Sequence, residues 1–306
     1  MEAKFQSLLD LAKEIAADRR AMVPSVIKEI MHYEIIQALL ETEAARDLVF
    51  QGGTALRLCY DGNRYSEDLD FAGGTAFKPS AMSGFMDRLT NNVGKTYGLT
   101  VQIEQRLPDR NDSVPVGRWK AKIVLPQQDR SLKQAHVIHL EVAEVPAYSG
   151  EVRLVRPISP TAEYAYRSLM LKTESREEIL ADKIVALGGR EYLKQRDIWD
   201  IHMLAQSNIA LDIGLVGQKI ADYHLVENSF LQKLAERIDQ LKQAETQHAF
   251  SREMSRFLDG SVQRFLQDKN FLVQVFSTVA SIAQQASSEI VSKGERERSS
   301  IRFKIR

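Results

Sequence analysis

The chain has 306 residues, with 41 Lys and Arg against 41 Asp and Glu, and 44% of its residues are hydrophobic. At roughly 150 residues per domain, this length predicts about two domains with enough apolar sequence for a buried core. The composition excludes a disordered chain, a collagen and a low-complexity repeat. The single cysteine, Cys59, excludes a disulfide framework and a cysteine-based metal finger. Zero formal net charge argues against a wholly electrostatic nucleic-acid binder, but it allows a local basic groove.

Hydropathy gives no sign of a membrane protein. No segment reaches the roughly 20 consecutive apolar residues that a spanning helix needs. The N-terminal segment is amphipathic, carries charge throughout and lacks the apolar run of a signal peptide. We therefore expect a cytoplasmic protein with no membrane partner.

Residues 1–157 predict a domain that mixes helices and strands. Apolar residues recur at helical spacing over 5–43, and Pro24 divides this stretch into two helices. The apolar run 48–50, two glycines and a helical stretch over 55–60 predict a strand, a tight turn and a helix. Alternating residues predict further strands at 68–71, 99–104, 119–125 and 137–142, and a helix is expected over 77–98. The pattern is that of an α+β domain, a sheet with flanking helices.

The hydropathy pattern changes after Pro157 and Pro160, where the spacing of apolar residues becomes almost entirely helical. We place a domain boundary in this proline-bearing connector, at residues 155–160. A helical domain is expected over residues 158–290. Residues 291–306 are polar and mostly basic, which predicts a solvated, frayed tail.

A glycine turn lies between the first strand and the helix after it. Gly52 and Gly53 let the backbone approach a ligand closely, and the helix start offers unpaired N–H groups to a phosphate. Thr54 adds a hydroxyl group at the same place. A purely structural turn would have the same sequence.

Acidic residues form the second candidate feature. Asp68 and Asp70 are two residues apart on a predicted strand, so both carboxylates project from one face. Like charges held this close favour a bound cation, and Mg²⁺ prefers hard oxygen ligands and phosphates. If the strand carrying Glu141 is a neighbour, three carboxylates converge, as two-metal phosphoryl chemistry requires. Glu144 is an alternative third acid, and exposed acids without a ligand would show the same spacing.

A third candidate cluster lies in the helical domain. Lys183 flanks the apolar stripe of its predicted helix, from which a lysine can reach a triphosphate as a point charge, although a surface lysine fits as well. Asp197 and Asp200 follow on the next predicted helix. The six histidines are dispersed and show no zinc-binding spacing, so His139 and His202 are expected to be structural.

Three sequence blocks in order, GGTALRL, RYSEDLDF and EEILADKIVAL…RDIWDIHML, resemble the bacterial nucleotidyltransferase toxins of the abortive-infection AbiE type and the related MenT toxins. The resemblance covers roughly residues 45–205. It implies a DNA-polymerase-β-like nucleotidyltransferase sheet followed by a helical C-terminal domain. It also implies Mg²⁺, a nucleoside triphosphate (NTP) substrate, and addition of nucleotides to the 3′ end of tRNA. The implied partner is a cognate antitoxin, often a winged-helix DNA-binding protein.

The resemblance assigns roles to individual residues. Gly53 and Thr54 match a motif that is usually Gly-Ser, so the threonine keeps the hydroxyl and adds a methyl group. Asp68 and Asp70 match the metal-binding acids, and Lys183 matches a lysine that contacts the nucleotide. The remaining matches are looser: Arg64 and Ser66 stand just upstream of the acids, Asp197 or Asp200 matches a later acid, and Glu141 is the third strand acid.

The leading hypothesis is therefore a Mg-dependent toxin that transfers nucleotides from an NTP to an RNA 3′-hydroxyl. The alternatives are a nucleotidyltransferase acting on a protein or small molecule, and a non-catalytic NTP-binding module. An RNA acceptor needs local positive charge, for which the candidates are Arg57, Arg64, Lys120, Lys122, Arg190, Lys194 and the tail 293–306.

Overall fold

Two helices open the chain, one on each side of Pro24. In the computed structural model, which describes residues 2–126, 135–158 and 169–304, α1 spans Glu2–Arg19 and α2 spans Val23–Leu40. Pro24 stands in the first turn of α2, where its missing N–H would have no helical partner in any case. The predicted division at this proline is confirmed.

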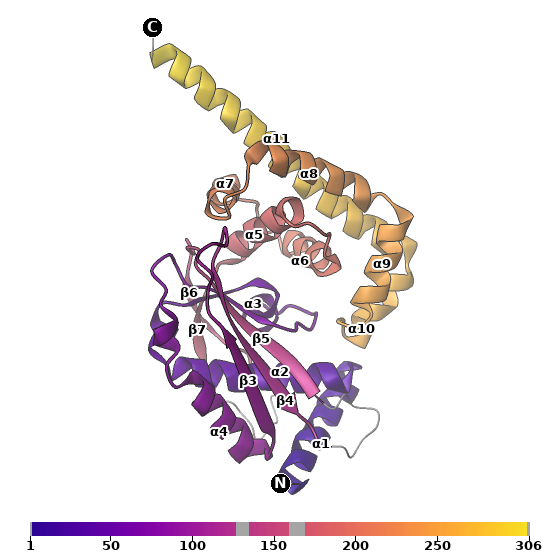
Figure 1. The fold of residues 1–306 in the computed structure, drawn as a ribbon. Coiled ribbons are helices and arrows are strands. Elements are labelled where there is room, and N and C mark those ends of the chain that lie inside the picture. The colour runs from indigo at the N-terminus through magenta and orange to yellow at the C-terminus, as the bar shows by residue number, and fades with distance from the viewer. Residues whose placement is uncertain (1, 127–134, 159–168, 305–306) are drawn as a thin grey trace. The chain divides into compact units, whose positions relative to one another are not determined.

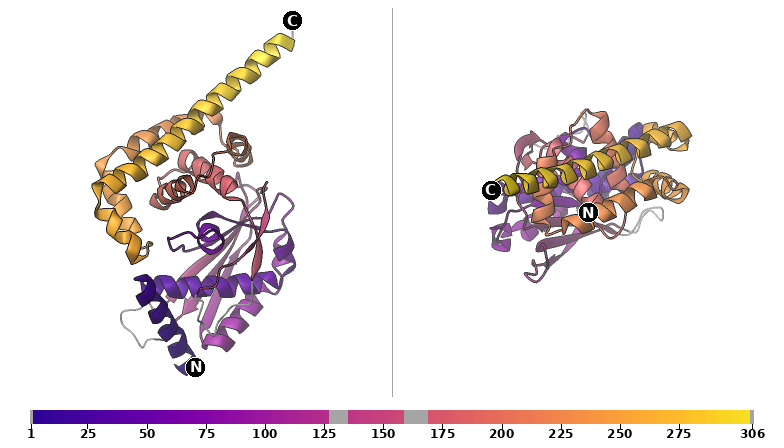
Figure 2. Two further views of the ribbon diagram at one scale, coloured as in Figure 1. Left: turned by 180° about the vertical axis from the view of Figure 1, so that it is seen from behind. Right: turned by 90° about the horizontal axis from the view of Figure 1, so that it is seen from above.

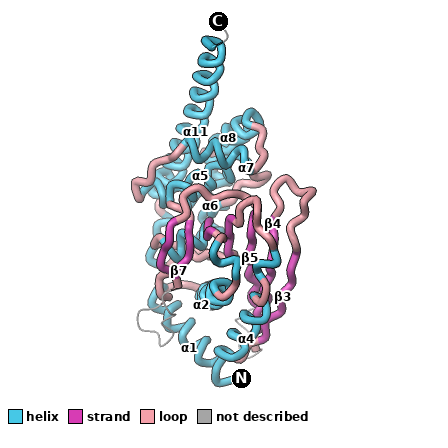
Figure 3. Tube along the Cα trace, turned by 90° about the vertical axis from the view of Figure 1, so that its left-hand side faces the viewer, coloured by secondary structure: helices cyan, strands magenta, loops and turns pink. Residues whose placement is uncertain are grey.

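A mixed sheet follows, with the strand order β3-β4-β5-β2-β1-β7-β6 (Figures 1 and 3). Neighbouring pairs are antiparallel except β2–β5 and β1–β7, which are parallel. The strands are β1 Val49–Gln51, β2 Leu69–Ala72, β3 Thr100–Arg106, β4 Val116–Val124, β5 Ala135–Ala143, β6 Glu151–Leu154 and β7 Met170–Thr173. Strands are present at all of the predicted positions, and β6 and β7 come in addition.

Helices cover the apolar face of this sheet. The α2 helix packs on β5, and α4 (Phe85–Tyr97) packs on β3 and on α2. The buried face of the sheet includes Trp119, Ile138, Leu140 and Phe71. Because side chains alternate along a strand, the residues between them on β2, β4 and β5 project from the opposite face. That opposite face carries the polar candidate residues.

Several local predictions differ from the structure. The stretch predicted as a helix over 77–98 begins with a 3₁₀ turn, η2 (Pro79–Met82), and α4 starts only after Gly84, whose φ of +77° breaks the helical path. Strand β7 lies where helix was expected, since four residues are too few for a helical period to be told from alternation. The expected frayed tail is helical through Lys304.

Most of the helices after Ser175 form a second group of packed elements. The α5 helix packs against α6, α7 and α8, and the long α11 packs against the same three helices. Figure 2 shows the C-terminal part of α11 running past the other helices of this group. These elements are α5 Arg176–Gly189, α6 Gln195–Gln206, α7 Ile213–Asp222, α8 Glu227–Leu241, α9 Ala244–Met254, η3 Arg264–Gln267 and α11 Lys269–Lys304.

The described chain divides into two compact units. The first unit runs to Ser175 and also includes residues 256–263, with the short helix α10 (Gly260–Gln263), whereas the second holds residues 176–255 and the described residues from Arg264 onward. The predicted domain boundary at residues 155–160 stays a prediction. Within the described ranges, no helix is long and apolar enough to cross a membrane.

Candidate active site

The predicted glycine turn joins β1 directly to α3 (Gly52–Cys59), with Gly52 as the first helical residue. Gly52 has a φ of +77°, a left-handed conformation that residues with a Cβ rarely adopt. A Cβ at this position would lie 2.9 Å from Oδ2 of Asp70. The turn is therefore glycine for two reasons, and it lies directly beside one of the predicted acids.

Gly53 lies against a buried arginine side chain. A Cβ at Gly53 would overlap the Arg64 guanidinium group, with its Cζ atom only 2.9 Å away. Arg64 is buried and donates from Nη1 to the carbonyl of Tyr65 at 3.1 Å. The structure thus brings Arg64 against the turn, as its predicted place in an NTP site requires.

The hydroxyl group of Thr54 forms a hydrogen bond inside the protein. Thr54 is fully buried and its Oγ1 donates to the backbone carbonyl of Asp68. This bond fixes the start of β2 to the first turn of α3. Ser66 is half-buried in the loop that leads to the same strand. A direct phosphate contact by Thr54 or Ser66 remains a prediction.

Polar residues form a row across four neighbouring strands. Asp70 of β2 pairs in register with Gln51 of β1 on one side and with Glu141 of β5 on the other, and Glu141 pairs with Arg118 of β4. Register partners in adjacent strands are the closest side-chain neighbours on a sheet face. The strands carrying Asp70 and Glu141 are therefore neighbours, which is the condition on which the third acid depended.

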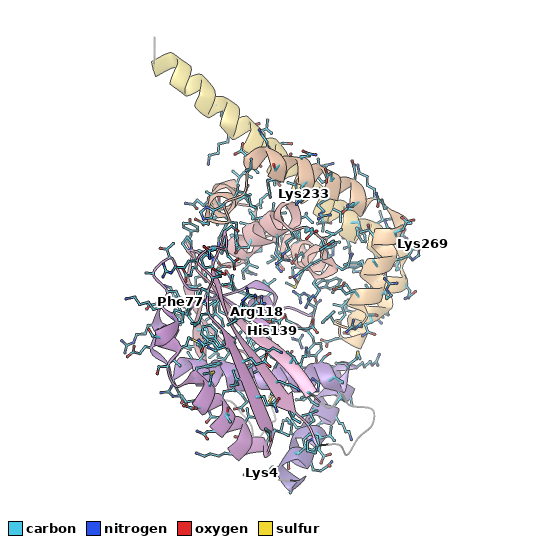
Figure 4. All side chains as sticks on the ribbon, in the orientation of Figure 1. Lys4, Phe77, Arg118, His139, Lys233 and Lys269 are labelled. Atoms are coloured by element: carbon cyan, nitrogen blue, oxygen red, sulfur yellow. The ribbon has the colours of Figure 1, made fainter. Side chains whose placement is uncertain are left out.

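Asp68 lies just before β2 and contacts the neighbouring strand. Its Oδ1 atom accepts two hydrogen bonds, from the backbone N–H of His139 at 3.1 Å and from His139 Nδ1, 3.0 Å away. Two contacts on a single carboxylate oxygen fix the orientation of the whole group. His139 is labelled in Figure 4 on β5, and the expectation that it is merely structural missed this contact.

Glu141 does not project alone. Nε of Arg118 donates to Glu141 Oε1 at 2.6 Å, and both side chains are partly exposed. Arg118 is labelled in Figure 4 beside His139. Among the described residues, no group of three or more His, Cys, Asp or Glu side chains is arranged to hold a metal ion. A three-carboxylate metal site therefore remains a prediction.

Two carboxylates still suit a magnesium ion that is bound together with a substrate. Mg²⁺ keeps several waters and is usually held by one or two carboxylates plus substrate phosphates. Asp68 and Asp70 are the first candidates, because Asp68 is oriented by His139 and Asp70 lies against the glycine turn. Such a turn and helix start are suited to bind the phosphates that would complete the coordination.

The third predicted cluster forms within the second unit. Nζ of Lys183 on α5 lies 2.7 Å from Asp197 Oδ1 and 2.8 Å from Asp200 Oδ2, both on α6, and all three side chains are buried. Arg190 also pairs with Asp197. Burial opposes ionisation of Asp197, but Lys183 and Arg190 outweigh it and hold the pKa of this carboxyl below its usual value. The structure brings the three predicted residues together as an ion-pair cluster, and a triphosphate contact by Lys183 remains a prediction.

The comparison with protein families decides the identity. The sequence model of the family described as nucleotidyl transferase AbiEii toxin, of the type IV toxin–antitoxin system, matches residues 34–271. This chain belongs to that family. Membership implies an antitoxin partner and an NTP substrate, and it confirms the resemblance found in the three sequence blocks.

A solved structure shows the same fold, and a second is similar to this chain over most of its length. MenT4, a nucleotidyltransferase toxin of Mycobacterium tuberculosis H37Rv, is 16% identical, with 90% of this chain and 92% of that chain covered and a TM-score of 0.54. JHP933 of Helicobacter pylori is 18% identical, with 91% and 98% covered and a TM-score of 0.44. No curated protein matches this chain in sequence.

Sequence reasoning about this AbiEii family member missed two residues of the site, His139 and Arg118. His139 stands two residues before Glu141 on one strand, so their shared face was visible in the alternation. Arg118 had no such signal, because its contact with Glu141 depends on the register between β4 and β5.

Proposed function

We propose that this chain is a Mg-dependent toxin that transfers nucleotides from an NTP to the 3′ end of tRNA, as part of a phage-defence, abortive-infection system in the cytoplasm. The observation that supports this most is the contact between the glycine turn and the acid pair. Gly52 approaches Asp70 so closely that a Cβ would lie 2.9 Å from its carboxylate. The backbone proposed to bind phosphate, at Gly52, thus lies next to a carboxylate oxygen proposed to bind the metal ion, that of Asp70.

Each group in the proposed site has one task. The N–H groups that begin α3 would bind phosphate, and Asp68 and Asp70 would hold Mg²⁺, which would neutralise charge on the triphosphate. Arg64 supports the turn from behind Gly53. Glu141, oriented by Arg118, is the candidate to accept the proton of the attacking 3′-hydroxyl group.

The acceptor is proposed to bind on the polar face of the sheet. Arg118, Lys120 and Lys122 alternate along β4 and therefore share this face, while Lys120 also pairs with Glu104 at 2.9 Å. Two of the predicted RNA contacts have little surface to offer to RNA, since Arg64 is buried and the side chain of Arg57 is only 9% exposed. If several surface cations bind RNA phosphates, the log–log salt slope of the affinity should be about −0.7 per contact.

The test is to incubate the purified chain with Mg²⁺, total tRNA and each labelled NTP in turn. The proposal expects label at the tRNA 3′ end, its loss with a chelator, and its loss in Asp70→Asn. Labelling of protein or of a small molecule instead of tRNA would support the alternative acceptors. NTP binding without any transfer would support a non-catalytic module.

A second measurement tests RNA as the acceptor through salt dependence. RNA affinity of the full chain and of a chain truncated after Gln285 is compared at two salt concentrations. A steep salt response is expected for the full chain and a weaker one for the truncated chain. A flat response in the full chain would contradict an RNA acceptor.

A further inference from the structure

Residues 256–263 belong to the first unit, although the described residues on both sides of them in the sequence belong to the second. We call residues 256–263 the strap. It lies between α9 and η3 and ends in α10, which Figures 1 and 2 show beside the corner where α1 meets α2. Gly260 makes that approach possible, since a Cβ there would lie 3.0 Å from the Arg20 carbonyl oxygen.

The strap is bound to the loop that leads to the acid pair. The N–H of Tyr65 donates to the carbonyl of Phe257 at 2.7 Å, and Arg64 and Leu258 form an antiparallel bridge. Leu258 is 1% exposed. The backbone bridge, to which the Tyr65–Phe257 hydrogen bond belongs, therefore holds the loop at the position of Arg64, and the Leu258 side chain is buried at that bridge.

The strap also contacts the helix that starts at the glycine turn. Oδ2 of Asp259 lies 3.8 Å from Nη1 of Arg57, a residue of α3. Arg57 in turn pairs with Glu29 of α2 at 2.7 Å, and its guanidinium group lies 4.2 Å from the centre of the Tyr65 ring. The strap thus contacts both α3, the helix that begins at the glycine turn, and the loop whose Arg64 side chain lies against that turn.

We propose that the strap is a positioning element for the NTP site. It holds Arg64 against Gly53, and the guanidinium group thereby fixes the path of the backbone whose N–H groups bind phosphate. A segment some 200 residues away in sequence would then determine nucleotide affinity without touching the nucleotide. This inference rests on the proposed function of the glycine turn.

The test compares two leucine-to-alanine variants of the full chain. Leu258→Ala loosens the strap, and the control Leu89→Ala removes an equally buried leucine from α4, which packs on β3 and α2. Hydrogen exchange of peptides covering 52–57 reports the turn directly. Steady-state kinetics with Mg²⁺ and each of ATP, GTP, CTP and UTP report its function.

We expect Leu258→Ala to speed exchange at 52–57 and to raise KM for the NTP about tenfold, since a misplacement far from the chemistry can cost up to about a hundredfold. The value of kcat should change less, because the phosphate contacts exist in both the ground state and the transition state. Leu89→Ala, at a matched loss of thermal stability, should leave both readouts unchanged. Equal effects of the two variants, or none from Leu258→Ala, would overturn the proposal.

Asp259→Asn provides a second variant in case Leu258→Ala does not fold. It keeps the size of the side chain and removes its charge next to Arg57, so the same changes are expected in weaker form. Unchanged exchange and KM in a folded Asp259→Asn would count against the contact with α3. A wild-type chain that binds no NTP would contradict the proposed function, whereas the exchange experiment would still decide whether the strap fixes the turn.

Discussion

Lys183→Ala is the substitution whose effect on the free energy of unfolding follows most directly from the structure. It removes the cation from between Asp197 and Asp200, whose side chains are 4% and 1% exposed. Breaking a buried ion pair by removing one partner costs about 3–5 kcal/mol, because a buried charge is left uncompensated. Arg190 still pairs with Asp197 in the variant, so we expect a loss of about 3 kcal/mol, at the lower end of that range.

A matched control is present in the same unit. Lys242 pairs with Asp239 at 2.7 Å, the same distance as Lys183 to Asp197, but these side chains are 63% and 74% exposed. Lys242→Ala should cost at most about 0.5 kcal/mol, because water screens an exposed pair. The assay is denaturant unfolding of both variants beside the wild type at pH 7.

Lowering the pH should reduce the loss of stability that Lys183→Ala causes relative to the wild type. Without the lysine, the folded-state pKa of a buried carboxyl rises above its unfolded value, so folding takes up a proton and stability relative to wild type recovers as the pH falls. The reasoning is refuted if Lys183→Ala loses no more stability than Lys242→Ala. Kinetics of the folded variant test the triphosphate contact separately, for which we expect roughly 1.5–3 kcal/mol of weakened NTP binding or turnover.

Three further predictions concern the acids, the Arg118–Glu141 pair and a buried histidine. Asp68→Ala and Asp70→Ala should each abolish transfer without unfolding the chain, with Asp68→Ala lowering the unfolding free energy by about 3 kcal/mol at most, because its carboxylate accepts hydrogen bonds from His139; near-normal transfer with Mg²⁺ would disprove the metal assignment. Arg118→Ala and Glu141→Gln should each slow transfer, and the double variant should be no worse than the worse single one because the groups act as a pair; multiplied effects would mean separate roles. Burial lowers the pKa of His202 from 6.5, so the unfolded state binds more protons, and the melting temperature should decrease as the pH is lowered past about 6.5. His202→Leu should make this decrease smaller, whereas His248→Asn, at an exposed position, should not. Equal pH dependence in the two variants would exclude His202 as a cause.

The sequence predicted the elements of this fold better than their contacts. Helices on each side of Pro24 and the acid-bearing strand followed from local spacing, because burial of one face imposes a period on the chain. Strand β7 was missed because four residues give no period of their own. Its partners are β6, an equally short strand that was also missed, and β1, which lies more than 100 residues earlier in the chain. Short strands and long-range pairing therefore limited the fold prediction.

The candidate site shows the same limit at the level of single atoms. Spacing placed Asp68 and Asp70 on one face, but the partner of each acid depends on strand register. His139 meets Asp68, and Arg118 meets Glu141, only because β5 lies between β2 and β4 in this register. A slip of one residue would turn every second side chain of β5 into the apolar core. The buried Leu140 and Val142 of β5 therefore hold the register that orients the acids. Substitutions at these apolar positions should reduce transfer, because they would displace the acids on the opposite, polar face of the sheet.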